Sequence, residues 1–147
     1  PNQESFSIPA GGDVKQTPRT GLTGEMIVEV VEENCINFAD DRMPPVLSTP
    51  WLVAYLEFVA RDALAACLED HERSVGSLVE IEHLAPSPIG SRVTCRARVI
   101  HVDGASVTFR IEAFDEKEPV ARGLHKRHVI DADRFARRVA KKRDARA

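Results

Sequence analysis

One segment constrains the fold of this chain more than any other, because it begins as a helix and is apolar on almost every side. The run Ser48-Thr49-Pro50 places a hydroxyl at the N-cap and proline at the first helical position, the strongest helix-start signal in the chain. We expect this helix to run from about Pro50 to Leu68. At about 100° per residue, one face carries an apolar set and further apolar residues populate the other faces. That set is Leu52, Leu56, Val59, Ala60, Ala63 and Cys67. Such a helix must be covered on most sides.

Strand-like runs rich in Val and Ile supply the cover. One run precedes the helix and, after a loop over Asn34–Ser48 and the helix itself, four more follow. They are Glu25–Glu33, Ser77–Leu84, Ser91–Val102, Ala105–Phe114 and Val120–Ile130. Asp103-Gly104 between two of these runs is a specific hairpin signal, and short turns between neighbours indicate antiparallel pairing. The sequence therefore predicts an α+β fold, with a five-stranded antiparallel sheet wrapped around a long central helix. Apolar surface left at the sheet edge and the helix start predicts a homodimer.

The 147 residues fit one domain with two appendages. Residues 1–21 contain three prolines and three glycines and are expected to form a partly flexible arm. Residues 22–131 form the sheet-and-helix domain, and residues 132–147 form a basic helix, Ala132–Lys142, with a tail.

The composition excludes several classes of protein. A net charge of −3 argues against a surface built for nucleic acid, and no charge-free apolar run is long enough to span a membrane. The first residues show no basic flank or apolar stretch typical of a secretory signal. Cys35, Cys67 and Cys95 are widely spaced and show no metal-ligand spacing, so we expect three buried thiols in a reducing cytoplasm and no metal.

Glu57 does not fit its surroundings, because the helical pattern places it at the edge of the apolar face. An unpaired carboxylate there costs several kcal/mol, so it must be paired, protonated or used. A catalytic role and an i,i+4 pair with Arg61, worth about 0.3–0.5 kcal/mol at a surface, are equally good interpretations at this stage.

His83 and Thr49 also have two interpretations each. Strand alternation places His83 on the face of Val79 and Ile81, toward the helix, either as a core histidine bound to backbone or as a proton-handling partner of a carboxylate. Thr49 either only caps the helix or also directs a hydrogen bond at a substrate, where helix N–H groups can hold an oxyanion. The remaining histidines are weaker candidates: they are His71, His101, His125 and His128. No dinucleotide, P-loop or serine-hydrolase motif is present.

Two segments resemble the fluoroacetyl-CoA thioesterase family. They are Val46–Phe58, sequence VLSTPWLVAYLEF, and Gly76–His83, sequence GSLVEIEH, with the Pro86–Gly90 turn after it. The resemblance, over about Leu22–Phe135, implies a hotdog-fold homodimer that hydrolyses acyl-CoA thioesters with a threonine, a glutamate and a histidine. By motif these are Thr49, Glu57 and His83. Coenzyme A is then part of the substrate, and no separate cofactor is expected.

The resemblance implies two substrate-binding positions as well. Gly76 corresponds to a glycine whose N–H lines the acyl site, and Arg127, in Gly123-Leu124-His125-Lys126-Arg127, to an arginine near the pantetheine or phosphate end. The sequence departs from the family at Met43-Pro44-Pro45, where the fluoroacetate enzyme has aromatic gating residues. The acyl group is therefore left open.

Helix geometry predicts how the three residues meet. Thr49 and Glu57 are eight residues apart, about 12 Å along one helix, so we expect Thr49 of one subunit to approach Glu57 of the other. Glu57 then acts as nucleophile or as general base, and the sequence does not separate the two routes. The alternative to a thioesterase is a non-catalytic acyl-CoA-binding or sensing module; hotdog hydratase chemistry lacks its Asp/His motif.

The C-terminal segment is strongly basic. Residues 134–147 carry seven Lys or Arg and one Asp, which is most simply a solvated helix end. If Phe135 and Val139 dock this helix on the sheet, its charges would attract the phosphates of coenzyme A.

Overall fold

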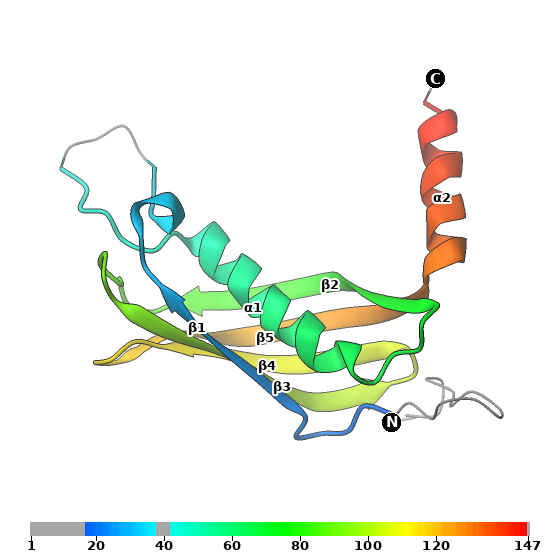
Figure 1. Cartoon of the computed structure of the whole chain (residues 1–147), viewed down its shortest axis with the longest axis horizontal. Coiled ribbons are helices and arrows are strands. Elements are labelled where there is room, and N and C mark those ends of the chain that lie inside the picture. The colour runs from blue at the N-terminus through cyan, green and yellow to red at the C-terminus, as the bar shows by residue number, and fades with distance from the viewer. Residues whose placement is uncertain (1–16, 38–41, 147) are drawn as a thin grey trace.

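The computed structural model describes residues 17–37 and 42–146. The five strands form one antiparallel sheet in the order β1-β3-β4-β5-β2 (Figure 1). The elements along the chain are β1 (Thr23–Glu29), the 3₁₀ helix η1 (Glu32–Asn34), α1 (Thr49–Ala65), β2 (Glu72–His83), β3 (Arg92–Asp103), β4 (Ser106–Phe114), β5 (Pro119–Asp131) and α2 (Ala132–Asp144). The predicted strand–helix–four-strand order and the hairpin at Asp103-Gly104 are confirmed, with Asp103 paired to Ser106.

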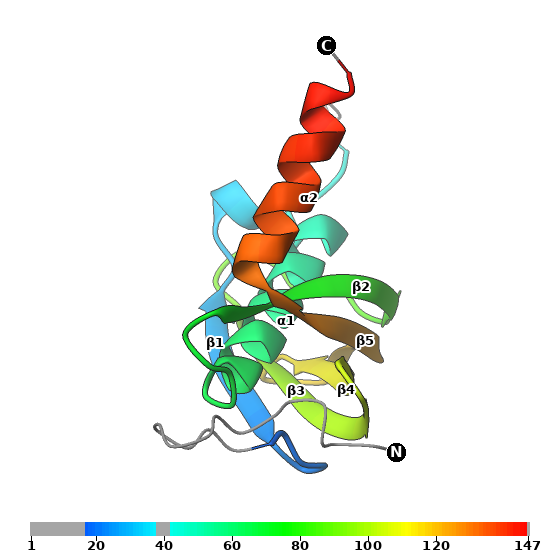
Figure 2. The ribbon, with the colours of Figure 1, turned by 90° about the vertical axis from the view of Figure 1, so that its right-hand side faces the viewer.

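The sheet curls around α1, which is the arrangement that an almost wholly apolar helix requires. Viewed from one end, the strands form a trough with β1 on one side and β2 on the other, and α1 lies inside it (Figure 2). Leu52, Leu56 and Leu64 of α1 are fully buried. They belong to one core with inward residues of the strands, among them Val99, Phe109 and Ile111. Truncating one such leucine to alanine costs about 2–5 kcal/mol of stability.

The start of α1 differs from the prediction in a useful way. Ser48, not Thr49, is the N-cap: its Oγ accepts a hydrogen bond from the Trp51 N–H at 3.3 Å, and Pro50 is the second helical residue. Thr49 was expected to cap the helix, and this expectation is wrong. Because Ser48 supplies the cap, worth about 1 kcal/mol, the hydroxyl of Thr49 is available for another partner.

Three element boundaries also differ. β1 ends at Glu29 instead of Glu33, because the Asn34 side chain accepts from the Val31 N–H at 2.9 Å and donates to the Glu29 carbonyl at 3.0 Å, which closes a turn. Helix α1 ends at Ala65, three residues early, in a turn made by the Cys67 N–H and the Leu64 carbonyl. Strand β2 begins five residues before Ser77, because its pairing with β5 continues to Glu72 opposite Asp131.

A β-bulge in β2 sets which residues face α1. Gly76 pairs with Arg127 and Leu78 pairs with Lys126, so Ser77 is an extra residue. Residues directly opposite each other in antiparallel strands point to the same face, and an extra residue shifts the alternation by one. The bulge therefore places Gly76 on the same face as His83, although seven positions separate them and strict alternation would put them on opposite faces.

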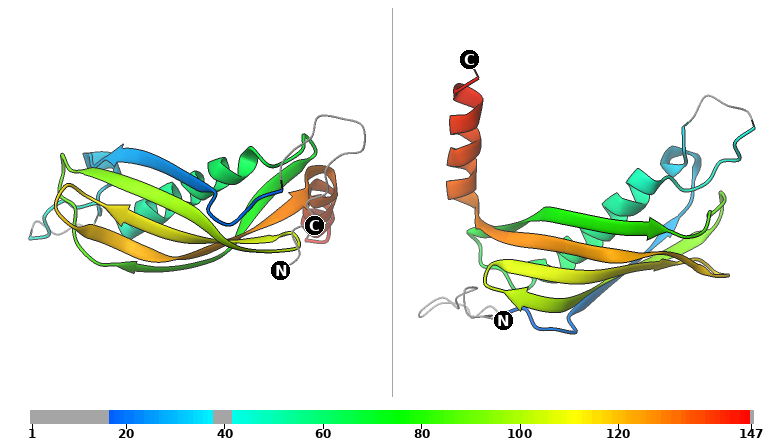
Figure 3. Two further views of the ribbon diagram at one scale, coloured as in Figure 1. Left: turned by 90° about the horizontal axis from the view of Figure 1, so that it is seen from below. Right: turned by 180° about the vertical axis from the view of Figure 1, so that it is seen from behind.

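Two predictions concern the segments that flank the domain. Residues 1–16 of the predicted N-terminal arm lie outside the described residues. Helix α2 has no buried residue and stands away from the sheet beyond the end of β5 (Figure 3). Phe135 and Val139 remain 40% and 50% exposed, so the docking of this helix on the sheet is not observed.

The three cysteines are free and buried, as predicted. Burial raises the pKa of the Cys95 thiol to about 12, so it remains protonated and unreactive. Within residues 17–37 and 42–146, no helix is both long and apolar enough to cross a membrane.

Candidate functional site

The first cluster of candidate residues joins the start of α1 to the end of β2. Thr49 Oγ lies 2.7 Å from His83 Nδ1, a hydrogen bond between side chains 34 residues apart. Both residues line a cavity of about 360 Å³ whose other walls are mainly apolar. Those walls are Ile36, Met43, Val46, Leu47, Leu84, Ala85 and Pro86. A hydroxyl and an imidazole thus lie beside a space suited to an acyl chain.

His83 is held neutral and has one nitrogen unused. Burial lowers the pKa of His83, so the imidazole is uncharged at neutral pH. Its Nε2 is buried and has no hydrogen-bond partner among the described residues. A buried polar atom without a partner is costly, which indicates that a group outside this chain or a substrate completes it.

The second cluster surrounds Glu57, two turns further along α1. Glu57 Oε2, on α1, lies 3.3 Å from Arg127 Nη1, on strand β5. One of the two interpretations of Glu57, an i,i+4 pair with Arg61, is not observed: Arg61 pairs with the exposed Asp62 at 3.4 Å. The Glu57 side chain remains 38% exposed. Its carboxylate is therefore paired on one oxygen and open on the side away from the sheet.

Arg127 is buried beneath this carboxylate. Its side chain is 6% exposed, and it donates to the Ser74 Oγ at 2.8 Å and the Ser74 carbonyl at 2.9 Å. Burial lowers the pKa of Arg127 while the Glu57 carboxylate opposes the shift, and the guanidinium stays charged. The structure makes Arg127 the counter-ion of Glu57, and its position near the pantetheine or phosphate end of a ligand stays a prediction.

His125 belongs to the same cluster, although the sequence pattern makes it one of the weaker histidine candidates. Its Nδ1–H donates to the Leu78 carbonyl at 2.8 Å, which leaves Nε2 to accept from Arg127 Nη1 at 3.2 Å. Nε2 also lies 4.0 Å from Glu57 Oε2. Burial is the main cause of a lowered pKa at His125. The signal that identifies it is its spacing, since residues two apart on a strand share a face and Arg127 is two positions away.

Gly76 lies directly against the Glu57 carboxylate. A Cβ at this position would come within 2.5 Å of Glu57 Oε2 and 3.2 Å of His125 Cε1. No side chain larger than hydrogen fits there unless the carboxylate moves. The structure thus places Gly76, Glu57 and Arg127 side by side.

The two clusters do not meet within one chain. Thr49 and Glu57 are separated by eight residues of regular helix, about 12 Å along its axis. Among the described residues, neither Thr49 nor His83 forms a hydrogen bond with Glu57. Within one chain, the hydroxyl–imidazole pair is therefore separate from the Glu57 carboxylate.

Comparisons with known proteins point to one family. The family model of the fluoroacetyl-CoA-specific thioesterase FlK matches residues 30–133. The fluoroacetyl-CoA thioesterase of Streptantibioticus cattleyicolor is 32% identical over 104 residues, which cover 71% of this chain and 75% of that protein.

Solved structures give the same result for the fold. A mutant of the fluoroacetyl-CoA-specific thioesterase superposes with a TM-score of 0.80 at 27% identity, covering 87% of this chain and 99% of the other. A hot-dog-like protein from Thermanaerovibrio acidaminovorans has a TM-score of 0.79 at 28% identity, with coverages of 84% and 91%. With its hotdog fold and a family match over most of its length, the chain belongs to the fluoroacetyl-CoA-specific thioesterase family.

Proposed function

We propose that this thioesterase hydrolyses an acyl-CoA to the free acid and coenzyme A at two equivalent sites of a homodimer. Each cluster lacks groups that the other contains, and this observation carries the proposal. The Thr49–His83 cluster has an acyl-sized cavity and an unpartnered Nε2 but no carboxylate. The Glu57 cluster has a carboxylate with an exposed side, and among the described residues no hydrogen bond joins it to Thr49 or His83.

The free edge of β2 supports an antiparallel dimer that joins these halves. β2 is the last strand of the sheet, so one of its edges has no strand beside it, and Val79 in its middle is 38% exposed. Pairing this edge with a second copy would extend the sheet through a two-fold axis. An axis near Val79 and Glu80 places His83 of one subunit opposite Gly76 of the other, and hence beside Glu57 of the partner subunit.

The outer face of α1 supports the same arrangement. Trp51 and Phe58 are seven residues, or about two helical turns, apart, and they are 44% and 42% exposed. Two α1 helices on the same side of a continuous sheet would cover these side chains against each other. The sequence predicts a dimer contact at the sheet edge and the helix start, and the exposure of Val79 and Trp51 supports that proposal.

In this arrangement, each group has a defined task. The acyl chain occupies the cavity, and its carbonyl lies at the start of α1, where Thr49 donates a hydrogen bond and the helix N-terminus favours a developing negative charge. The partner's Glu57 attacks the carbonyl carbon, the C–S bond breaks, and the thiolate of coenzyme A leaves and takes up a proton. Water then hydrolyses the mixed anhydride and regenerates the carboxylate. In the general-base route, Glu57 removes a proton from water, which attacks instead.

The other groups prepare the carboxylate. Arg127, oriented by His125 and Ser74, pairs with Glu57 and fixes one of its oxygens. With Thr49 donating to the carbonyl, the neutral His83 donates from Nδ1 to the Thr49 Oγ, and its Nε2 accepts a hydrogen bond from the attacking water and orients it. Water and the thioester supply every atom of the reaction, so the proposal requires no cofactor. The buried free cysteines are compatible with a reducing, cytoplasmic location.

Thiol release from a panel of acyl-CoAs tests the proposal. We expect steady release that depends on Glu57, with the preferred acyl group set by the cavity around Met43 and Leu84. Turnover in H₂¹⁸O separates the two routes, because only the covalent one places ¹⁸O in the Glu57 side chain. Tight binding of acyl-CoAs without any thiol release would overturn the proposal in favour of a binding or sensing module.

A further inference from the structure

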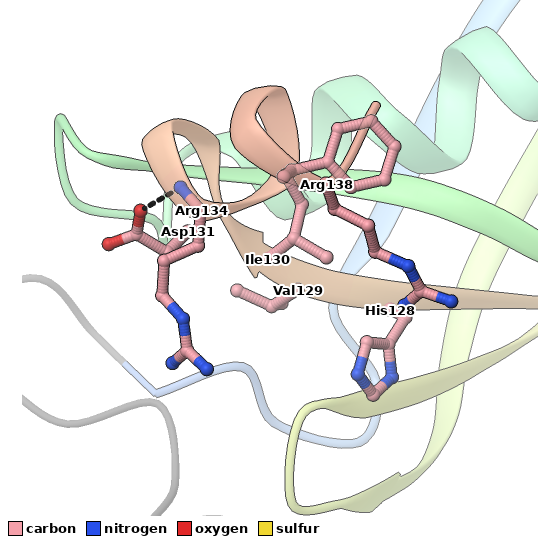
Figure 4. A pocket seen from close by; sticks show the side chains of 7 residues that line it. His128, Val129, Ile130, Asp131, Arg134 and Arg138 are labelled. Carbon is pink, nitrogen blue, oxygen red and sulfur yellow. Dashed lines mark hydrogen bonds between the residues drawn. The ribbon is translucent and has the colours of Figure 1, made fainter. Parts of the chain in front are cut away.

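We propose that a basic cavity at the root of α2 binds the nucleotide end of coenzyme A, an inference that rests on the proposed function. The cavity, of about 390 Å³, lies between the end of β5 and the first turns of α2 (Figure 4). It is lined by His128, Val129, Ile130, Asp131, Arg134, Phe135 and Arg138. It is separate from the cavity that holds Thr49 and His83.

The charges around this cavity favour a phosphorylated ligand. Three basic side chains line it, with Arg138 near His128 and Arg134 on the other side (Figure 4). Within the described part of the chain, neither guanidinium has a carboxylate within 4 Å. The single carboxylate present, that of Asp131, caps α2 by accepting from the Arg134 N–H at 3.0 Å. The two arginines are therefore available for phosphate oxygens.

The apolar part of the lining fits a purine ring. Phe135 presents a half-exposed aromatic ring, and Val129 and Ile130 form the floor beneath it. Flat aromatic bases stack on such rings, and arginine guanidinium groups add to that stacking. Phosphate-binding arginines beside an aromatic surface are the combination that a phosphorylated adenosine requires.

The position of the cavity relates it to the partner's acyl site. Helix α2 follows β5 directly, where Asp131 pairs with Glu72 at the start of β2. A two-fold axis near Val79 and Glu80 places Glu72 near Pro86 of the partner subunit. Pro86 lines the acyl cavity, so the root of α2 lies beside the partner's reaction site. The pantetheine arm of coenzyme A would connect the two.

Truncated substrates test this assignment. In the double variant Arg134→Ala/Arg138→Ala we expect KM for acyl-CoA to rise about tenfold with kcat unchanged, while kinetics with the matching acyl-pantetheine stay as in the wild type. Adenosine 3′,5′-bisphosphate should inhibit the wild type competitively and the double variant at least tenfold more weakly. Arg137→Ala is the matched control, since it removes an arginine of the same helix that does not line the cavity, and it should behave as wild type.

Three outcomes would overturn the inference. They are equal KM values for acyl-CoA and acyl-pantetheine in the wild type, equal losses for both substrates in the double variant, and adenosine 3′,5′-bisphosphate inhibition that the double variant keeps. Loss of single-stranded DNA binding without any change in acyl-CoA kinetics would assign the cavity to nucleic acid instead. Failure of the proposed function looks different, because the wild type would then hydrolyse neither substrate.

Discussion

The Thr49–His83 cluster and the Glu57 cluster carry the same proposed reaction but are built in opposite ways. The first joins a helix start to a strand end through one hydrogen bond, beside an open apolar cavity, and its imidazole is neutral. The second is a network between α1 and the last two strands of the sheet, β5 and β2, in which Arg127 contacts Glu57, His125 and Ser74. The difference indicates a division of labour: one half receives the acyl group, and the other holds a charge in place.

That division also explains why neither cluster is complete alone. The Glu57 network holds one carboxylate oxygen through Arg127, whereas a cavity that admits substrate needs open space and unused hydrogen-bonding atoms. Placing them at different points of α1 keeps the carboxylate away from the cavity of its own chain. A two-fold axis can then bring the two together twice.

The largest effect is expected at Glu57, because in the proposed mechanism it bonds to the reacting carbon or activates water. Glu57→Gln should lower kcat at least a thousandfold while the variant remains a folded dimer by size-exclusion chromatography and circular dichroism. Asp62→Asn is the control, since it removes an exposed carboxylate of the same helix. Retention of a tenth of wild-type turnover in Glu57→Gln would exclude this residue from the chemistry.

Changes in the other cluster should cost less. Thr49→Val and His83→Ala each remove one end of the 2.7 Å hydrogen bond, and we expect about a hundredfold loss in kcat. Thr49→Ser keeps the hydroxyl and should keep most of the activity. A serine variant as weak as the valine variant would show that the methyl group and packing, not the hydroxyl, are what matter at this position.

Gly76 tests how closely the network fits. Gly76→Ala places a methyl group where the Glu57 carboxylate lies, and the carboxylate must move by several tenths of an ångström or more. We expect about a tenfold loss in kcat with little change in stability. Ser77→Ala, at the exposed bulge position, is the matched control. Wild-type turnover in Gly76→Ala would mean that the position of the carboxylate is not critical.

The smallest effect is on pH dependence. The neutral form of His83 is the active one, and burial holds its pKa below the ordinary 6.5. Activity should therefore be level through neutral pH and fall only as the solution is acidified below that value. The acid limb of kcat/KM should disappear in His83→Gln. An acid limb centred above 6.5 in the wild type would contradict a neutral, desolvated histidine.

Much of the fold was predictable, because hydrophobic patterns act locally. The apolar pattern predicts the helix and Asp103-Gly104 predicts a hairpin. Together with the Val- and Ile-rich runs they give the order of helix and strands along the chain. The β2 bulge was not predictable from Ser77, because a serine does not mark an extra strand residue. Only the pairing of β2 with β5 reveals the bulge. Strict alternation would separate Gly76 from His83, and the resemblance to the thioesterase family supplied what local pattern did not.

The candidate site followed the same rule. Thr49, Glu57 and His83 stood out as polar groups near apolar faces, but their partners are set by tertiary contacts. Ser48 took the cap that Thr49 was expected to supply, and Arg127 replaced Arg61 as the partner of Glu57. His125 is one of several histidines on strands, and its position two residues from Arg127, on the same face of β5, distinguishes it.

Mixing two inactive variants tests the composite site most directly. Combine His83→Ala with Glu57→Gln in equal amounts, let subunits exchange, and measure thiol release. Half of the dimers are then mixed, and each mixed dimer contains one site built from two intact halves, so activity should return to about a quarter of wild type. If each site were built within one chain, every site would carry a broken half and the mixture would stay as inactive as its components.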